Sequence, residues 1–122
     1  MSNNEFEITE KTANAVNSHF SFPTGPIRLR MIRSTLVFEI RNPGMRMTAK
    51  APKATTILRK EFGLSGKPVK LLAQFETLLQ MVGVIEPWDI NTGTDETGAL
   101  RILTREEAVQ LKKDSTRDTS IN

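Results

Sequence analysis

The order of apolar and polar positions predicts strands in the first part of the core and helices in the second. Between Ile27 and Arg41, apolar residues recur at every second position, first at odd numbers and then at even ones. Side chains of a strand point to opposite faces in turn, so this alternation predicts β-structure. The change of phase predicts a bulge or a tight turn between residues 32 and 35, because a regular strand cannot exchange its two faces.

The strand pattern continues after a predicted turn. Pro43 and Gly44 suit the central positions of a type II turn. Residues 45–50 then alternate again, with apolar side chains at 45, 47 and 49. The segment is therefore expected to form a two- or three-stranded antiparallel meander with one apolar face and one face of basic residues.

Two helices are expected to follow this meander. Residues 53–62 form the first, and Gly63 suits its end. The second begins at Pro68, which suits a first helical position, and ends at Gly83. Its three- and four-residue spacing predicts a helix that packs on the apolar face of the sheet. The inward positions are Leu71, Leu72, Phe75, Leu78, Leu79 and Val82, and the outward ones are Lys70, Gln74, Glu76, Thr77 and Gln80.

Polar sequence flanks this core on both sides. Residues 1–25 are expected to form a polar N-terminal arm, in which 8–20 could form a short helix. Residues 26–88 form the core domain, which ends near Trp88, and 89–122 form a flexible acidic tail with a short helix that starts at a capping box of Thr104 and Glu107. The predicted fold class is α+β, a small antiparallel meander packed against a helical hairpin with a polar C-terminal tail.

Composition limits the class of protein. A chain of 122 residues is most simply one domain, and it holds no apolar run of the length of a membrane span. The first ten residues include three glutamates and no basic residue, which is unlike a secretory signal or a transit peptide. There is no cysteine, so a disulfide framework and a thiolate metal site are excluded. We expect a cytoplasmic protein that does not associate with membranes.

Charge is distributed unevenly along the chain. The net charge is +3, but residues 25–70 carry eleven basic and two acidic residues, a net charge of +9. Such a segment either offers a positive face to a polyanion or is neutralised by the acidic ends of the chain. The residues expected to bind nucleic acid or a partner are Arg28, Arg30, Arg33, Arg41, Arg46, Lys50, Lys67 and Lys70.

Motifs for catalysis or metal binding are incomplete. Gly66 and Lys67 stand as in a phosphate-binding loop, but Pro68 replaces the hydroxyl residue that the motif needs. Asp89, Asn91 and Gly93 are spaced like the start of a calcium loop, but the acidic residue that closes such a loop is absent. The single histidine, His19, is expected to be an ordinary surface residue. We therefore expect no catalytic residue, metal or cofactor.

The two predicted helices and their turn resemble a helix-turn-helix motif. The resemblance covers about 20 residues and rests on the spacing of Leu58, Phe62, Gly63, Leu64, Val69 and Leu72. Arg59 departs from the motif, which has a small residue at that position. The resemblance implies DNA recognition by the second helix, and a plain helical corner is the other interpretation.

Two function classes follow from these patterns. The first is a small non-enzymatic protein that binds nucleic acid or regulates through its basic central face. The second is a structural or assembly subunit of a homo-oligomer or a larger protein complex, in which the basic sheet and the acidic tail are docking surfaces. An aromatic surface for stacking bases is not evident, since Phe38 shares its predicted face with apolar residues.

Overall fold

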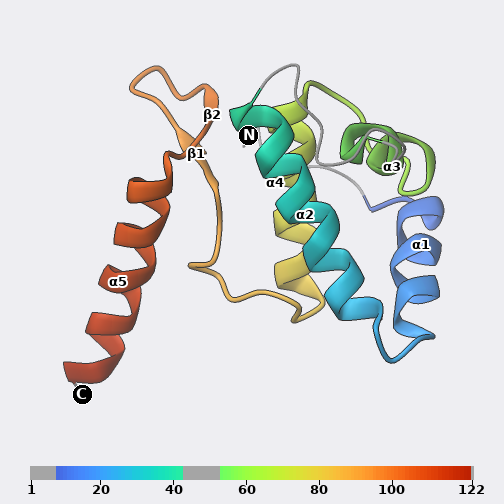
Figure 1. Cartoon of the computed structure of the whole chain (residues 1–122), viewed down its shortest axis with the longest axis horizontal. Helices are drawn as coiled ribbons and strands as arrows, with labels where there is room; N and C mark the ends of the chain where they lie inside the picture. The colour runs from blue at the N-terminus through green and yellow to red at the C-terminus, as the bar shows by residue number, and fades with distance from the viewer. Residues whose placement is uncertain (1–7, 43–52, 122) are drawn as a thin grey trace.

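The computed structural model describes residues 8–42 and 53–121, with side chains in the last helix described up to Asp114. Five α-helices and one two-stranded antiparallel sheet lie within these residues (Figure 1). In chain order the elements are α1 (Glu10–Phe20), α2 (Gly25–Arg41), α3 (Ala54–Lys60), α4 (Pro68–Met81), β1 (Thr92–Thr94), β2 (Leu100–Ile102) and α5 (Arg105–Ile121). The fold is thus predominantly helical with a small sheet, which confirms the α+β class only in that coarse sense.

Residues 25–41 form the helix α2, so the predicted strands at 27–41 are wrong. The side chains that α2 turns inward include Leu29, Leu36 and Val37, which are buried, together with the partly buried Ile32 and Ile40. This spacing of three, four and one residues is helical. The predicted turn at Pro43 and strand at 45–50 lie outside the described residues.

The alternation that suggested strands in α2 includes two apolar residues on its solvent side. Ile27 and Met31 are 61% and 62% exposed, one turn apart on the helix. They completed an odd-numbered pattern with Leu29. The even-numbered pattern combined Leu36 and Ile40 of the inner side with Phe38, which lies outside the core cluster. Burial of a helical stripe against α4 therefore overrides the β-preference of the individual side chains.

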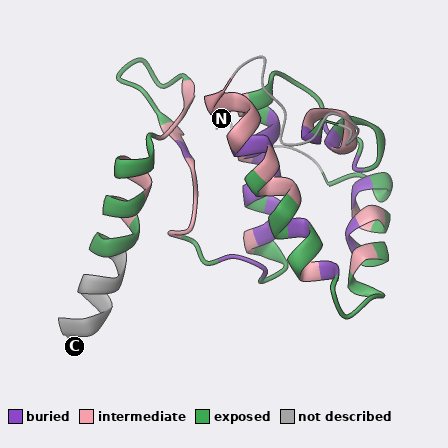
Figure 2. Ribbon diagram, viewed as in Figure 1, coloured by how far each residue is buried: buried purple, intermediate pink, exposed green. Residues whose placement is uncertain are grey.

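The core lies between α2 and α4, with α1 and α3 beside them (Figure 2). The helix predicted from Pro68 is confirmed, but it packs on α2 and on the small β1–β2 hairpin, because the sheet predicted at 27–41 is absent. The first predicted helix and the short N-terminal one are also confirmed as α3 and α1. Val16 of α1 is buried in the same core cluster, so the N-terminal arm contributes to the core.

The segment after Trp88 forms a hairpin, although its sequence suggested a loop. Strands β1 and β2 pair antiparallel, with Gly93 opposite Arg101, and both pack against α4. A carboxylate organises the turn, because Asp95 Oδ1 accepts hydrogen bonds from the backbone N–H groups of Thr97 and Ala99 at 2.8 and 3.0 Å. Local hydrogen bonds in the turn thus stabilise the hairpin, whose strand pairing could not be predicted from so short an apolar pattern.

The last helix begins as predicted and then extends away from the body. Glu107 Oε1 accepts from Thr104 N at 2.9 Å, and Thr104 Oγ1 accepts from Glu107 N at 3.1 Å, which confirms the capping box. Helix α5 stands apart from the other four helices (Figure 1). Within the described residues, no helix combines the length and the apolar character that a membrane crossing requires.

Candidate nucleic-acid interface

Three arginines of α2 form hydrogen bonds to another part of the molecule. Each guanidinium donates to a backbone carbonyl of the segment that follows α4, so α2 holds that segment in place. The contacts are Arg30 to Val84 O at 2.7 and 3.1 Å, Arg33 to Asp89 O at 2.6 Å, and Arg41 to Leu103 O at 2.8 Å. Arg30 and Arg41 were predicted to lie on an exposed sheet face, and that prediction is wrong because residues 25–41 form a helix.

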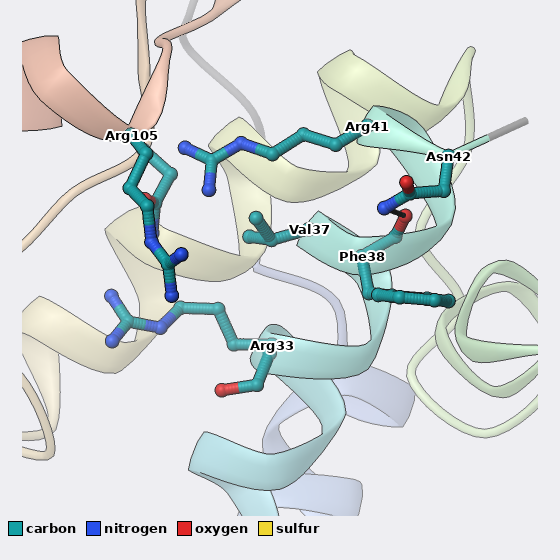
Figure 3. Close-up of a pocket in the computed structure, with 8 residues that line it drawn as sticks. Arg33, Val37, Phe38, Arg41, Asn42 and Arg105 are labelled. Atoms are coloured by element: carbon teal, nitrogen blue, oxygen red, sulfur yellow. Dashed lines mark hydrogen bonds between the residues drawn. The ribbon is translucent and has the colours of Figure 1, made fainter. Parts of the chain in front are cut away.

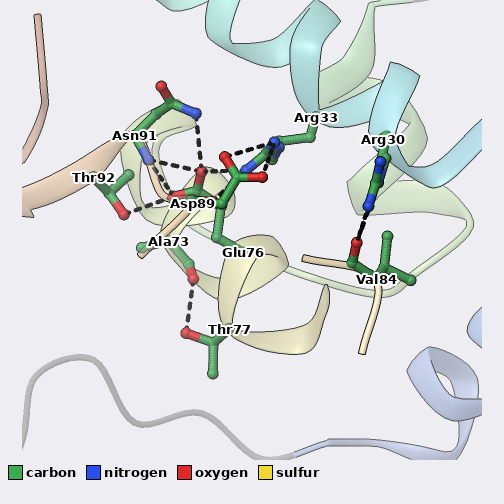
Figure 4. A network of polar contacts seen from close by, with 9 residues as sticks. All are labelled: Arg30, Arg33, Ala73, Glu76, Thr77, Val84, Asp89, Asn91 and Thr92. Carbon is green, nitrogen blue, oxygen red and sulfur yellow. Dashed lines mark hydrogen bonds and ion pairs between the residues drawn. The ribbon is translucent and has the colours of Figure 1, made fainter. Parts of the chain in front are cut away.

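Arg33 is the most deeply placed of the three, and it belongs to a polar network around Glu76. The Glu76 carboxylate accepts from Arg33 Nη1 at 3.4 Å, from the backbone N–H of Asn91 at 2.9 Å, and from Thr92 Oγ1 at 2.9 Å (Figure 4). Glu76 is only 1% exposed. Glu76 and Gln74 were both predicted to face outward, and both are buried.

Burial is the main influence on the ionisation of Glu76. It raises the pKa of the carboxyl above its usual value, while the hydrogen bonds from Thr92 and Asn91 and the charge of Arg33 act in the opposite direction. A carboxylate held by several donors in the interior is a structural anchor that joins α4, α2 and β1. Asn91 and Asp89, which are spaced like the start of a calcium loop, bind Glu76 and Arg33 instead.

The remaining predicted arginine of α2 that the structure describes is solvent-exposed. Arg28 lines a shallow cleft with His19 and Glu61. The His19 ring stacks on Phe62 with ring centres 5.6 Å apart. Partial burial lowers the pKa of His19, with a further lowering by Arg28 and an opposing effect of Glu61. His19 is therefore a packing residue of the core edge. Arg46 and Lys50 lie outside the described residues.

Helices α3 and α4 meet at the corner predicted from the sequence. The apolar positions Leu58, Phe62, Leu64 and Leu72 are buried, as the helix-turn-helix spacing requires. Gly63 has φ +70°, a left-handed conformation that favours glycine, and it reverses the chain after α3. The backbone N–H of Leu64 donates to Leu58 O at 3.1 Å. The connection runs from residue 61 to 67, longer than the three or four residues usual for the motif.

Two side chains hold this longer connection in place. Gln74 Nε2 donates to Ser65 O at 2.9 Å from its buried position on α4. Arg59 Nη2 donates to Gly66 O at 3.0 Å across the outside of the turn. Arg59 therefore lies on the surface and does not separate the two helices, although the motif has a small residue there. The spacing of apolar residues could not identify either contact, because each one joins a polar side chain to a backbone carbonyl.

One face of α4 is left open to solvent. Lys67, Lys70 and Thr77 are exposed, and Ala73 between them is partly exposed. These positions recur at three and four residues and so lie on one side of the helix. The opposite side carries the buried residues that pack on α2. Of the eight predicted site residues, the structure thus brings Lys67 and Lys70 together on a surface that is free to meet a partner.

In the part of the chain that the structure describes, no group of three or more His, Asp or Glu side chains is arranged to hold a metal ion. Glu39 Oε2 accepts from the backbone N–H of Ala54 at 2.8 Å at the start of α3.

Comparison with known protein families, with curated proteins and with solved structures gives no match. Function is therefore inferred from the residues of this chain alone.

Proposed function

We propose that this protein binds double-stranded DNA through α3, the connection 61–67 and α4. The observation that carries the proposal is the open face of α4. It begins with Lys67 and Lys70 at the N-terminal end of the helix, while the other side fixes the helix on α2. In helix-turn-helix proteins the second helix lies in the major groove and its N-terminal residues contact base edges.

The charges and sizes of the exposed side chains suit this placement. Lys67 and Lys70 lie where the aligned peptide dipoles of α4 also favour a phosphate. Ala73 and Thr77 are small, so the helix can approach the floor of a groove that is wide enough for an α-helix. Lys60 is exposed near the end of α3. It adds positive charge where the first helix of the motif crosses the phosphate backbone.

The aromatic residues favour duplex over single-stranded nucleic acid. Recognition of single strands relies on exposed aromatic rings that stack on unpaired bases. The two rings nearest the proposed interface, Phe62 and Phe75, are fully buried and pack edge to face with centres 5.4 Å apart. The open face of α4 thus offers charge and small side chains without a stacking surface.

A mixture of the protein with duplex DNA should form a complex at low salt and lose it steeply as salt rises. Neutralised phosphates release counterions, so the logarithm of affinity falls by about 0.9 per contact for each logarithmic unit of salt. Size-exclusion chromatography with light scattering, with a generic duplex and a matched single strand, checks this. A protein that elutes alone with both nucleic acids at low salt would contradict the proposal.

The second candidate function is assembly, and helix α5 is the observation that favours it. A 17-residue helix that stands apart from the body lacks the packing that normally stabilises helices in proteins. Val109 on this helix is 47% exposed. The light-scattering measurement also decides this case, since a stable oligomer without DNA supports assembly and a monomer opposes it.

A further inference from the structure

A cleft between α2 and the start of α5 has the composition of an anion site. Its volume is about 530 Å³, and its walls include Arg33, Val37, Phe38, Arg41 and Arg105. Arg33 and Arg41 extend from α2 toward Arg105 at the first position of α5 (Figure 3). A volume of this size is typical of sites for small organic ligands.

Two of the three arginines form no ion pair with the described residues. Arg33 is paired with Glu76 and Asp89, both at 3.4 Å. Within residues 8–42 and 53–121, the ion pairs found do not include Arg41 or Arg105. Positive groups that share one cleft repel each other, so an added anion is favoured. Helices α2 and α5 are far apart in the sequence, so the excess positive charge of the cleft arises only when the chain folds.

Arg41 is held in place with part of its donor capacity unused. Its Nη2 donates to Leu103 O at 2.8 Å, which fixes the side chain across the cleft. Its Nε is buried and has no hydrogen-bond partner within the described part of the chain. A buried donor without an acceptor is unfavourable, and an oxyanion beside the guanidinium would satisfy it. The planar guanidinium can bind a carboxylate or a phosphate through two parallel N–H groups.

The rest of the cleft is suited to the organic part of such a ligand. Val37 provides apolar surface beside the arginines, and Ser34 provides a hydroxyl. An adjoining cleft shares Arg41, Asn91 and Arg105 and is lined by Trp88. The two clefts therefore place the indole ring of Trp88 and the guanidinium groups of Arg41 and Arg105 around one space.

We propose that this cleft binds a small organic anion whose phosphate or carboxylate group lies between Arg41 and Arg105. The apolar body of the ligand lies against Val37 (Figure 3). The site does not include Lys67 or Lys70, so it is separate from the proposed DNA surface on α4. Phosphate and carboxylate share the chemistry that Arg recognises, and the experiment distinguishes them.

Titrations with phenyl phosphate, benzoate and benzamide test the proposal on the full chain. Trp88, the single tryptophan, reports binding by its fluorescence, and the shift in melting temperature provides a second readout. We expect at least one of the two anions to bind in the millimolar range or more tightly, whereas the neutral benzamide does not. The preferred anion identifies the group that the site takes. Absence of binding by both anions, or equal binding of benzamide, would overturn the proposal.

Arg105 is the residue to replace, because it is exposed and its removal leaves the clamp of Arg41 intact. Arg105→Ala should weaken anion binding about tenfold or more, as expected for the loss of one charge-assisted contact. Arg105→Lys, which keeps the positive charge but loses the two parallel N–H donors of the guanidinium, should have a smaller effect. Arg28→Ala is the matched control and should bind normally.

The same variants separate this site from the DNA surface. Arg105→Ala should leave duplex affinity nearly unchanged, while Lys67→Ala with Lys70→Ala should leave anion binding unchanged. Equal anion affinity of Arg105→Ala and the unmodified protein would refute the site. Loss of duplex binding by Arg105→Ala would instead make the cleft part of a DNA surface and overturn the proposal of a small ligand.

Discussion

Replacing Phe62 by alanine should lower the free energy of unfolding by about 3–5 kcal/mol, the range usual for removal of a buried aromatic ring. Phe62 is fully buried, and its ring lies between two others. It stacks on His19 and meets the edge of Phe75. The Phe62 carbonyl also accepts a hydrogen bond from Thr12 Oγ1 of α1. The ring therefore joins α1 and α4 at the corner that positions the proposed DNA surface.

Urea denaturation followed by circular dichroism measures this loss. Phe22→Ala is the matched control, because Phe22 is 63% exposed and its removal should change stability by no more than about 0.5 kcal/mol. Similar destabilisation by the two variants would mean that the Phe62 ring is not packed at the corner between α1, α3 and α4.

Replacing Glu76 by glutamine should lower the free energy of unfolding by about 2–4 kcal/mol, although the two side chains have nearly the same shape. Both carboxylate oxygens accept hydrogen bonds, from Arg33, Asn91 and Thr92. A glutamine amide can accept at only one of its two terminal atoms, so its NH₂ group would face other donors. Arg33 would also lose a charged partner in a place where its side chain is only 12% exposed.

The direction in which pH changes the stability difference between the unmodified protein and Glu76→Gln can be predicted. Burial raises the pKa of Glu76 in the folded protein above its ordinary value of 4.5. The carboxyl therefore takes up a proton more readily in the folded than in the unfolded chain. Its contribution to stability is fully present below the unfolded pKa and decreases as pH rises through the folded pKa. The stability difference between the unmodified protein and Glu76→Gln should thus widen from pH 7 to pH 5. A narrowing would show that Arg33 and the hydrogen bonds outweigh burial.

Helices with a one-sided apolar stripe and clear end signals could be predicted from the sequence. In α4, Pro68 at the start and Gly83 after the end frame an apolar spacing that only a helix explains. In α2, apolar residues on the solvent side, Ile27 and Met31, produced an alternation that imitates a strand. The change from odd-numbered to even-numbered apolar positions after Met31 was the sequence signal for a helix, since helical spacing produces such a change without a bulge.

The candidate interface could be predicted in part. Lys67 and Lys70 were predicted from the basic segment 25–70, and the structure leaves both exposed. Arg30, Arg33 and Arg41 looked equally suitable in the sequence, because charge alone does not show what a side chain contacts. Their acceptors are backbone carbonyls more than 50 residues away, which no local pattern reveals. The same holds for Glu76, whose partners lie 15 and 16 residues further along the chain.

The charge of α4 is the most direct test of the proposed DNA surface. Duplex affinity is measured by fluorescence anisotropy over a range of salt, for the unmodified protein, for Lys67→Ala with Lys70→Ala, and for Arg28→Ala. Lys67, Lys70 and Arg28 are all exposed, so each variant should fold normally. The double variant is expected to bind at least tenfold more weakly at low salt, with a salt slope lower by about two units, while Arg28→Ala binds normally. Unchanged affinity and salt slope in the double variant would contradict DNA binding through α4.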